Sequence, residues 1–94
     1  MDKRQLIAAA ARRSSLTQRQ VGEALDAIVE TIADVLAEGG SVALSGLGRF
    51  EIKPYPGRRL HHFGGGGHYT VEGRSVPVFR SSAALRRRLR EEKR

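Results

Sequence analysis

Apolar residues near the start of the chain recur every three or four positions, which is the spacing of one face of an α-helix. Leu6, Ile7 and Ala10 begin the pattern. Just before them, Asp2 and Gln5 stand three residues apart, as the two members of a capping box do. The spacing predicts a first helix over about residues 3–13.

The same spacing returns in a longer stripe, made of Val21, Ala24, Leu25, Ile28, Ile32, Val35 and Leu36. Thr17 and Gln20 form a second capping-box pair in front of this stripe, and two consecutive glycines, Gly39 and Gly40, end it. A second helix is therefore predicted, and the two helices together form a body over about residues 1–40.

Beyond residue 40 the period changes to two, which is typical of β-strands. Val42 and Leu44 precede a turn at residues 45–48, and alternation then resumes at Phe50. Pro54 and Pro56 interrupt it, so the strand beyond residue 53 must be an edge strand or must leave the sheet. A further apolar strand is predicted over residues 76–79.

The stretch from about residue 54 to residue 75 contains almost no core-forming residues and includes four consecutive glycines at 64–67. We expect it to extend out of the globular part of the molecule. After the last strand, Ser81 or Ser82 can cap a C-terminal helix over about residues 82–92.

The charged residues are segregated along the sequence. The 94 residues carry 17 Lys and Arg against 10 Asp and Glu, a formal net charge of +7. Residues 21–38 contain five acids and no base, whereas residues 49–90 contain ten Lys and Arg against two acids. A basic block of this kind indicates a polyanionic partner.

Several classes of function are disfavoured by the composition. The sequence has no cysteine, which removes disulfides and thiolate chemistry, and it has no phosphate-binding loop motif. Three histidines are the one plausible metal constellation, and consecutive histidines on a strand point to opposite faces. No apolar run is long enough to span a membrane. We therefore expect a cytoplasmic protein that is not an enzyme, with no cofactor, metal, membrane or small-molecule partner.

The second helix presents more apolar surface than so short a chain can cover, and a two-fold homodimer is the usual solution. A monomer with a small three-helix core is the alternative. The residues expected at the dimer interface are large and apolar, and come from the second helix and the strands: Val21, Leu25, Ile28, Ile32, Leu44, Leu47, Phe50 and Phe79.

Three segments resemble the HU/IHF family of bacterial DNA-bending proteins in register: residues 2–7 (DKRQLI), residues 46–50 (GLGRF) and residues 76–81 (VPVFRS). The match extends from Asp2 to about Leu89. It implies a single α+β domain over residues 1–94 that forms an intertwined dimer. The domain consists of two N-terminal helices, a three-stranded antiparallel sheet that extends into a β-ribbon arm, and a short C-terminal helix. The sheet and arm are expected over about residues 41–80, with the tip of the arm at about 58–70.

The resemblance implies that the arms wrap the minor groove of double-stranded DNA in the bacterial nucleoid, largely without sequence specificity, and that the protein bends or compacts the DNA. The arm residues expected to bind DNA are Lys53, Arg58, Arg59, His61, His62, Phe63, His68 and Arg74. On the body they are Lys3, Arg80, Arg86 and Arg87. IHF-like site preference, coating or bridging of DNA without bending, RNA binding, and a purely structural basic dimer are the competing interpretations.

The tip of the arm departs from the family. Its relatives usually carry Arg-Asn-Pro there, with the proline as an intercalating wedge, whereas this chain has His61-His62-Phe63. Phenylalanine is among the apolar side chains that unstack base steps in the minor groove. Phe63 is accordingly predicted to be the wedge, the alternative being that it packs on the opposite strand of the ribbon.

Replacing this wedge is expected to separate binding from bending. The substitution Phe63→Ala removes the ring and leaves every cation in place, so DNA should still bind but should be bent less. Energy transfer between dyes at the two ends of a duplex measures the bend. Equal shortening by the variant and the parent protein contradicts the wedge.

Overall fold

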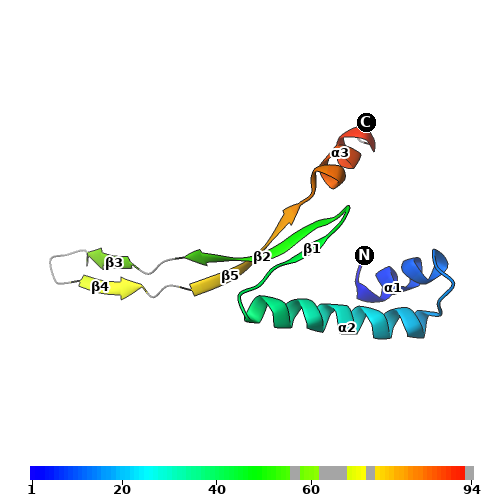
Figure 1. The fold of residues 1–94 in the computed structure, drawn as a ribbon, viewed down its shortest axis with the longest axis horizontal. Coiled ribbons are helices and arrows are strands. Elements are labelled where there is room, and N and C mark those ends of the chain that lie inside the picture. The colour runs from blue at the N-terminus through cyan, green and yellow to red at the C-terminus, as the bar shows by residue number, and fades with distance from the viewer. Residues whose placement is uncertain (56–57, 62–67, 72–73, 93–94) are drawn as a thin grey trace. The chain divides into compact units, whose positions relative to one another are not determined.

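The computed structural model describes residues 1–55, 58–61, 68–71 and 74–92, with the side chains described over 1–54 and 74–91. Helices and strands follow one another in the order α1, α2, β1, β2, β3, β4, β5, α3 (Figure 1). The chain divides into two compact units, Met1–Val35 and Leu36–Arg94, and the boundary falls near the end of α2.

The first helix, α1 (Lys3–Arg12), begins with the predicted capping box. The Gln5 backbone N–H donates to Asp2 Oδ1 and the Asp2 N–H donates to Gln5 Oε1, both at 2.9 Å. These two bonds satisfy donors that the first turn of a helix leaves without partners. The predicted helix at 3–13 is thereby confirmed, with Arg13 as its C-cap.

The second helix, α2 (Gln18–Ala37), is capped in the same way. The Gln20 N–H donates to Thr17 Oγ1 at 3.1 Å, and the Thr17 N–H donates to Gln20 Oε1 at 2.9 Å. At the far end Gly39 has φ of 87°, and its N–H donates to the carbonyl of Leu36 at 2.9 Å. Glycine adopts this left-handed conformation without the steric cost of a Cβ, which explains the stop.

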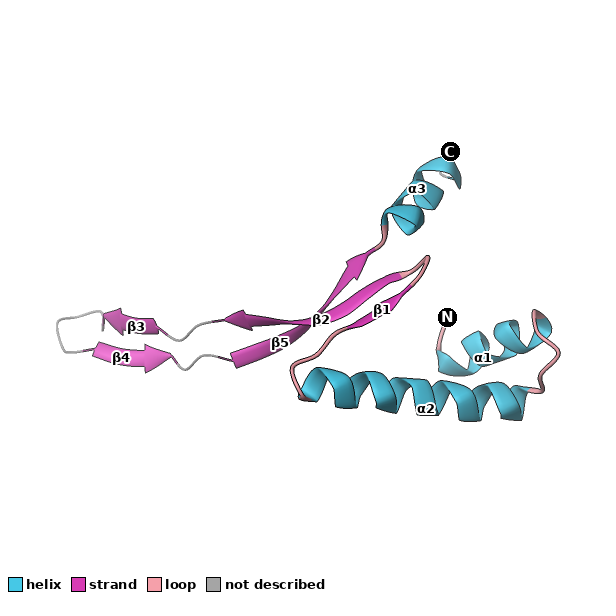
Figure 2. Cartoon of the chain, viewed as in Figure 1, coloured by secondary structure: helices cyan, strands magenta, loops and turns pink. Residues whose placement is uncertain are grey.

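Three strands form an antiparallel sheet in the order β1-β2-β5: β1 (Val42–Leu44), β2 (Gly48–Tyr55) and β5 (Arg74–Ser81) (Figure 2). Leu44 lies opposite Gly48, so the predicted turn joins β1 to β2 directly. Phe50 lies opposite Phe79, which fixes the register of the long β2–β5 ladder. The predicted three-stranded antiparallel sheet is confirmed.

Pro54 does not end the strand. The β2–β5 ladder continues past it, with Pro54 opposite Ser75 and Tyr55 opposite Arg74. Pairing with β1 stops at Phe50. Among the described residues, Pro54 therefore lies in a part of β2 that pairs with β5 on one side and with no strand on the other. A proline there breaks no ladder bond, since its missing N–H belongs on the open edge. Of the two outcomes predicted for residues beyond 53, the edge strand is the one observed.

A second, two-stranded antiparallel sheet pairs β3 (Arg58–His61) with β4 (His68–Val71). Arg58 lies opposite Val71 and His61 lies opposite His68. Strand pairing therefore reaches well into the segment predicted to be the tip of the arm. Residues 62–67, which include His62 and Phe63, lie outside the described part of the chain.

The C-terminal helix, α3 (Ala83–Glu92), follows the end of β5. Ser82, rather than Ser81, is its cap, because Ser82 Oγ accepts from the backbone N–H of Leu85 at 3.0 Å. The Ser82 N–H in turn donates to the carbonyl of Leu47 at 3.0 Å. One serine thus starts the helix and ties the end of β5 to the turn between β1 and β2.

The described residues of a single chain form no hydrophobic core. Across residues 1–54 and 74–91, Gly48 is the one buried residue, and Ile28, Val29 and Phe79 are 51%, 55% and 45% exposed. Within each unit these side chains stay about half exposed, Phe79 even though its ring lies against that of Phe50.

Close packing at Gly48 gives a stability prediction. A Cβ on this glycine lies 2.4 Å from the Arg80 carbonyl oxygen and 2.6 Å from Phe79 Cζ, so Gly48→Ala forces β2 and β5 apart. Overpacking of this kind costs about 1–3 kcal/mol. We expect thermal unfolding, followed by circular dichroism at fixed protein concentration, to show a melting temperature lower by several degrees.

Gly22→Ala is the matched control. A Cβ there lies 3.6 Å from Ile7 Cδ1, an ordinary contact, and alanine in a helix interior is favoured over glycine by about 0.5–1 kcal/mol. This variant should melt at or above the parent. A Gly48→Ala protein that melts as high as Gly22→Ala contradicts the tight β2–β5 packing.

Candidate nucleic-acid interface

The two faces of the β1-β2-β5 sheet differ in character, because successive residues of a strand point to opposite faces. On one face, Phe50 and Phe79 are opposite each other, with ring centroids 5.1 Å apart and an interplanar angle of 47°. Val42 extends this face, since it lies opposite Phe50 on β1. This is the apolar side of the sheet.

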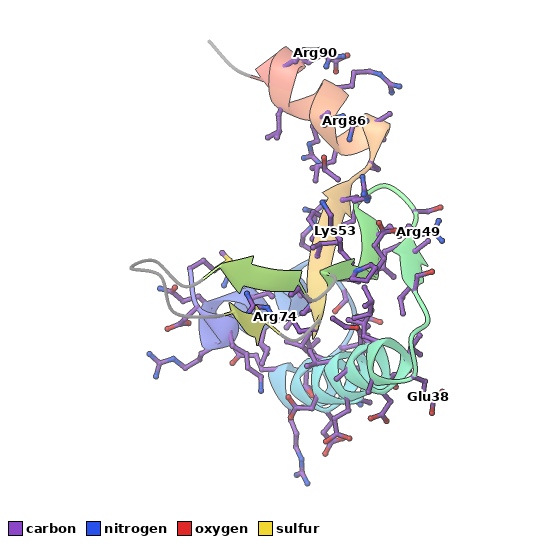
Figure 3. All side chains as sticks on the ribbon, turned by 90° about the vertical axis from the view of Figure 1, so that its left-hand side faces the viewer. Glu38, Arg49, Lys53, Arg74, Arg86 and Arg90 are labelled. Atoms are coloured by element: carbon purple, nitrogen blue, oxygen red, sulfur yellow. The ribbon has the colours of Figure 1, made fainter. Side chains whose placement is uncertain are left out.

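The other face carries charge. Arg49, Glu51 and Lys53 alternate with the apolar residues of β2, and Arg80 lies directly opposite Arg49 on β5. Figure 3 shows Arg49 and Lys53 among the side chains of these strands, with Arg86 and Arg90 on α3. Three cations and one acid thus occupy one face of two neighbouring strands, the arrangement expected of a surface that meets a phosphate backbone.

Glu51 holds both arginines of this face. Arg49 Nε is 3.2 Å from Glu51 Oε1, and Arg80 Nε donates to Glu51 Oε2. The side chains of Arg49 and Arg80 are 55% and 64% exposed, against 25% for Glu51. The carboxylate therefore lies beneath two guanidinium groups that remain open to solvent.

The junction between β5 and α3 adds a further cation. Arg86 Nη1 donates to the Ser81 backbone carbonyl and to Ser81 Oγ, the latter at 3.0 Å. A shallow depression beside it is lined by Arg49, Arg80, Ser81 and Ser82 together with residues of the β1–β2 turn. The structure thus places Arg86 against Ser81, which follows Arg80 in the sequence, and both arginines were predicted to bind DNA. Arg87, one position further along α3, is exposed.

Lys3, the remaining body residue predicted to bind DNA, belongs to the other unit of the chain. Its Nζ is 2.6 Å from Asp26 Oδ1, and both side chains are about three-fifths exposed (62% and 61%). Lys3 is thus paired with an acid of α2, and a phosphate that approaches it meets a carboxylate already in place.

The predicted arm residues fall on paired strands. Lys53 lies opposite Val76 and Arg74 opposite Tyr55, both on the β2–β5 ladder, and Lys53 is already engaged with a neighbour. For four further candidates the structure gives the backbone position: Arg58, Arg59 and His61 on β3 and His68 on β4. As DNA-binding residues, all of them stay predictions.

Two residues of the charged face, Arg49 and Glu51, were absent from the sequence-based candidates. The period-two alternation of residues 49–53 puts both on the face of Lys53, so the signal was present in the pattern. The pattern could not predict that Arg80 lies beside these two residues, because this depends on the register between two strands some thirty positions apart in the sequence.

Comparison with known proteins gives the family. Residues 1–90 match the family described as bacterial DNA-binding protein. The HU protein of Staphylococcus aureus is 35% identical over 86 residues, covering 92% of this chain and 96% of that protein. This chain belongs to the HU family of bacterial DNA-binding proteins. HU-beta of Salmonella typhimurium is similarly related, at 36% identity over 86 residues.

Solved HU structures share the fold. A cocrystal structure of Anabaena HU with DNA superposes with a TM-score of 0.79 at 28% identity, covering 95% of this chain and 97% of that chain. HU from Thermotoga maritima gives a TM-score of 0.68 at 28% identity, covering 95% and 98%. The resemblance inferred from three short segments is confirmed over nearly the whole chain. None of the described helices is long and apolar enough to cross a membrane.

The Lys3–Asp26 pair yields a prediction about affinity. Asp26→Asn removes the carboxylate that competes with phosphate for Lys3, so DNA should bind more tightly. We expect about a two- to fivefold effect, because an exposed ion pair contributes ~0.2–1 kcal/mol. Fluorescence anisotropy of a labelled duplex at fixed salt measures the change.

Glu23→Gln serves as the control. Glu23 also lies on α2 and pairs with Arg19 at 3.6 Å, so this substitution removes the same charge from a pair outside the predicted interface. A similar gain from Glu23→Gln and Asp26→Asn means that the effect comes from net charge and not from Lys3.

Proposed function

We propose that this protein is a homodimeric, HU-like architectural protein of the bacterial nucleoid. It binds double-stranded DNA largely without sequence specificity, through the basic face of its sheet and through minor-groove arms, and it bends or compacts the DNA. It acts by binding and not by catalysis. The observation that carries the proposal is the two-faced sheet, with Phe50 and Phe79 on one side and Arg49, Lys53 and Arg80 on the other.

Homodimerisation follows from the missing core. Leu44 and Leu47 are 37% and 42% exposed, and Val21, Leu25 and Ile32 are covered only in part. A second copy offers the same surfaces, and a two-fold axis lets each copy cover the other. Each Å² of apolar surface that the second copy removes from water stabilises the dimer by roughly 25 cal/mol. The eight interface residues predicted from the sequence are proposed to lie in this shared core, within a single domain over 1–94.

The arms are proposed to be the extension of the β2–β5 ladder through β3 and β4. A two-stranded ribbon fits a DNA groove and displays cations along its strands. Arg58, Arg59, His61 and His68 occupy such strand positions. His62 and the proposed wedge Phe63 follow β3 in the sequence, where the relatives' intercalating residue stands.

Binding is proposed to depend on shape and charge rather than on base sequence. Residues 41–80 contain neither Asn nor Gln, the side chains that read adenine by paired hydrogen bonds. Affinity then comes mainly from the release of counterions, and log K falls by about 0.9 per neutralised phosphate for each unit of log salt. IHF-like site preference by DNA deformability is the competing outcome, and the experiment below distinguishes it.

A bending assay tests the proposal. The protein is titrated onto a duplex of roughly 50 base pairs labelled at both ends, long enough to reach beyond a bent site. Two salt concentrations are compared, and a nicked duplex of the same sequence and an unrelated duplex are included. We expect the ends to approach, binding to weaken with salt, the nicked duplex to be preferred and the two sequences to bind alike.

The other outcomes are distinct. Salt-sensitive binding at an unchanged end-to-end distance means a dimer that coats or bridges DNA. A strong preference for one sequence means IHF-like recognition, and preference for RNA in the same assay contradicts the proposal altogether.

A further inference from the structure

Glu51 is the one acid among the charged residues on the open face of β2 and β5 described above, and it is shared by two arginines. We propose that Arg49 and Arg80 form a single two-pronged phosphate site on this face, and that Glu51 is its built-in competitor, which sets how tightly the sheet holds DNA. This inference rests on the proposed function and assigns a new binding residue, Arg49, to it.

The two arginines lie close enough together to bind the same phosphate. They lie directly opposite each other on antiparallel strands, where Cβ atoms are about 4.5–5.5 Å apart and side chains share a face. A guanidinium carries five N–H donors in a planar fork, and a phosphodiester offers two non-bridging oxygens. Each arginine can therefore donate to one oxygen of the same phosphate.

Their bonds in the free protein leave the necessary donors open. Arg80 engages Glu51 through Nε, and within the described residues no acceptor contacts its terminal nitrogens. Arg49 engages Glu51 through Nε and donates from Nη2 to Ser41 Oγ at 3.0 Å, which holds its guanidinium over the start of β1. Both arginines also line the shallow depression that includes Ser81 and Ser82.

Glu51 opposes the phosphate by its position and its charge. Its side chain is 25% exposed and lies beneath both arginines, so an incoming phosphate meets a carboxylate of the same sign across the guanidinium groups. With Glu51 charged the site carries a net +1, and without that charge it carries +2. The carboxylate thus lowers the affinity for DNA and reduces the number of DNA counterions that this site displaces.

The substitution Glu51→Gln tests this proposal because it removes the charge and keeps the size and one acceptor oxygen. The probe is a duplex of about 30 base pairs, long enough for several phosphate contacts, titrated by anisotropy over a series of salt concentrations. We expect affinity to rise by about three- to tenfold and the salt dependence to become steeper, since one partly exposed repulsion is removed from each protomer.

One control separates the site from overall charge. Glu38→Gln deletes the same charge just beyond α2, where the side chain is exposed, and should leave affinity within about twofold, because distant exposed charges are screened. Circular dichroism melts of each variant establish that it is folded.

The decisive comparison repeats Glu51→Gln in a protein that also carries Arg49→Ala and Arg80→Ala. There the gain should vanish, because the carboxylate has no phosphate site left to oppose. A gain of the same size in that background overturns the proposal. Weaker binding by Glu51→Gln itself also overturns it, because Glu51 then supports the arginines.

Arg49→Ala alone should weaken binding, and an unchanged affinity removes Arg49 from the site. Failure of the parent protein to bind the duplex refutes the proposed function instead, before any variant is compared.

Discussion

The structure depends on one constraint, which is that this chain cannot bury its own apolar residues. Its helices are capped and its strands are paired, so local structure is complete, yet side chains such as Ile28 and Phe79 remain about half exposed. Conformational entropy opposes the ordering of every residue, and only buried apolar area offsets that cost on the necessary scale. A second copy that covers these side chains is therefore proposed to be needed for folding, rather than an addition to a finished domain.

This constraint also underlies the surface proposed to bind DNA. A strand presents its residues alternately to two faces, and the face of Phe50 and Phe79 is the one proposed to enter the dimer core. Arg49, Lys53 and Arg80 are left on the opposite face by the same alternation. The tie between Ser82 and the β1–β2 turn then holds α3, with its arginines, at the end of that sheet. One period-two pattern thereby accounts for both the proposed interface between copies and the proposed surface for DNA.

The sequence was sufficient for features that depend on neighbours a few positions apart. Both capping boxes, the glycine stop at Gly39 and the turn before Gly48 are of this kind, and the structure confirms each. It was not sufficient where two distant segments meet. The edge position of Pro54 depends on where β1 stops, and the role of Glu51 depends on Arg80 arriving opposite Arg49. The wedge at Phe63 and the DNA contacts of the arm stay predictions, since they are properties of the complex with DNA.

Two acids placed beside the proposed DNA-binding cations explain how such a surface holds its shape without DNA. Asp26 and Glu51 reduce the repulsion among nearby positive charges and fix long side chains that otherwise sample many rotamers. The same acids are proposed to weaken the binding of each phosphate, so that the binding energy is spread over many modest contacts. A protein that binds without sequence preference gains mobility from this arrangement, because no single contact has to be broken at large cost when it moves along DNA. High affinity at one site favours the opposite arrangement, in which the cations face the phosphates with no acid between them.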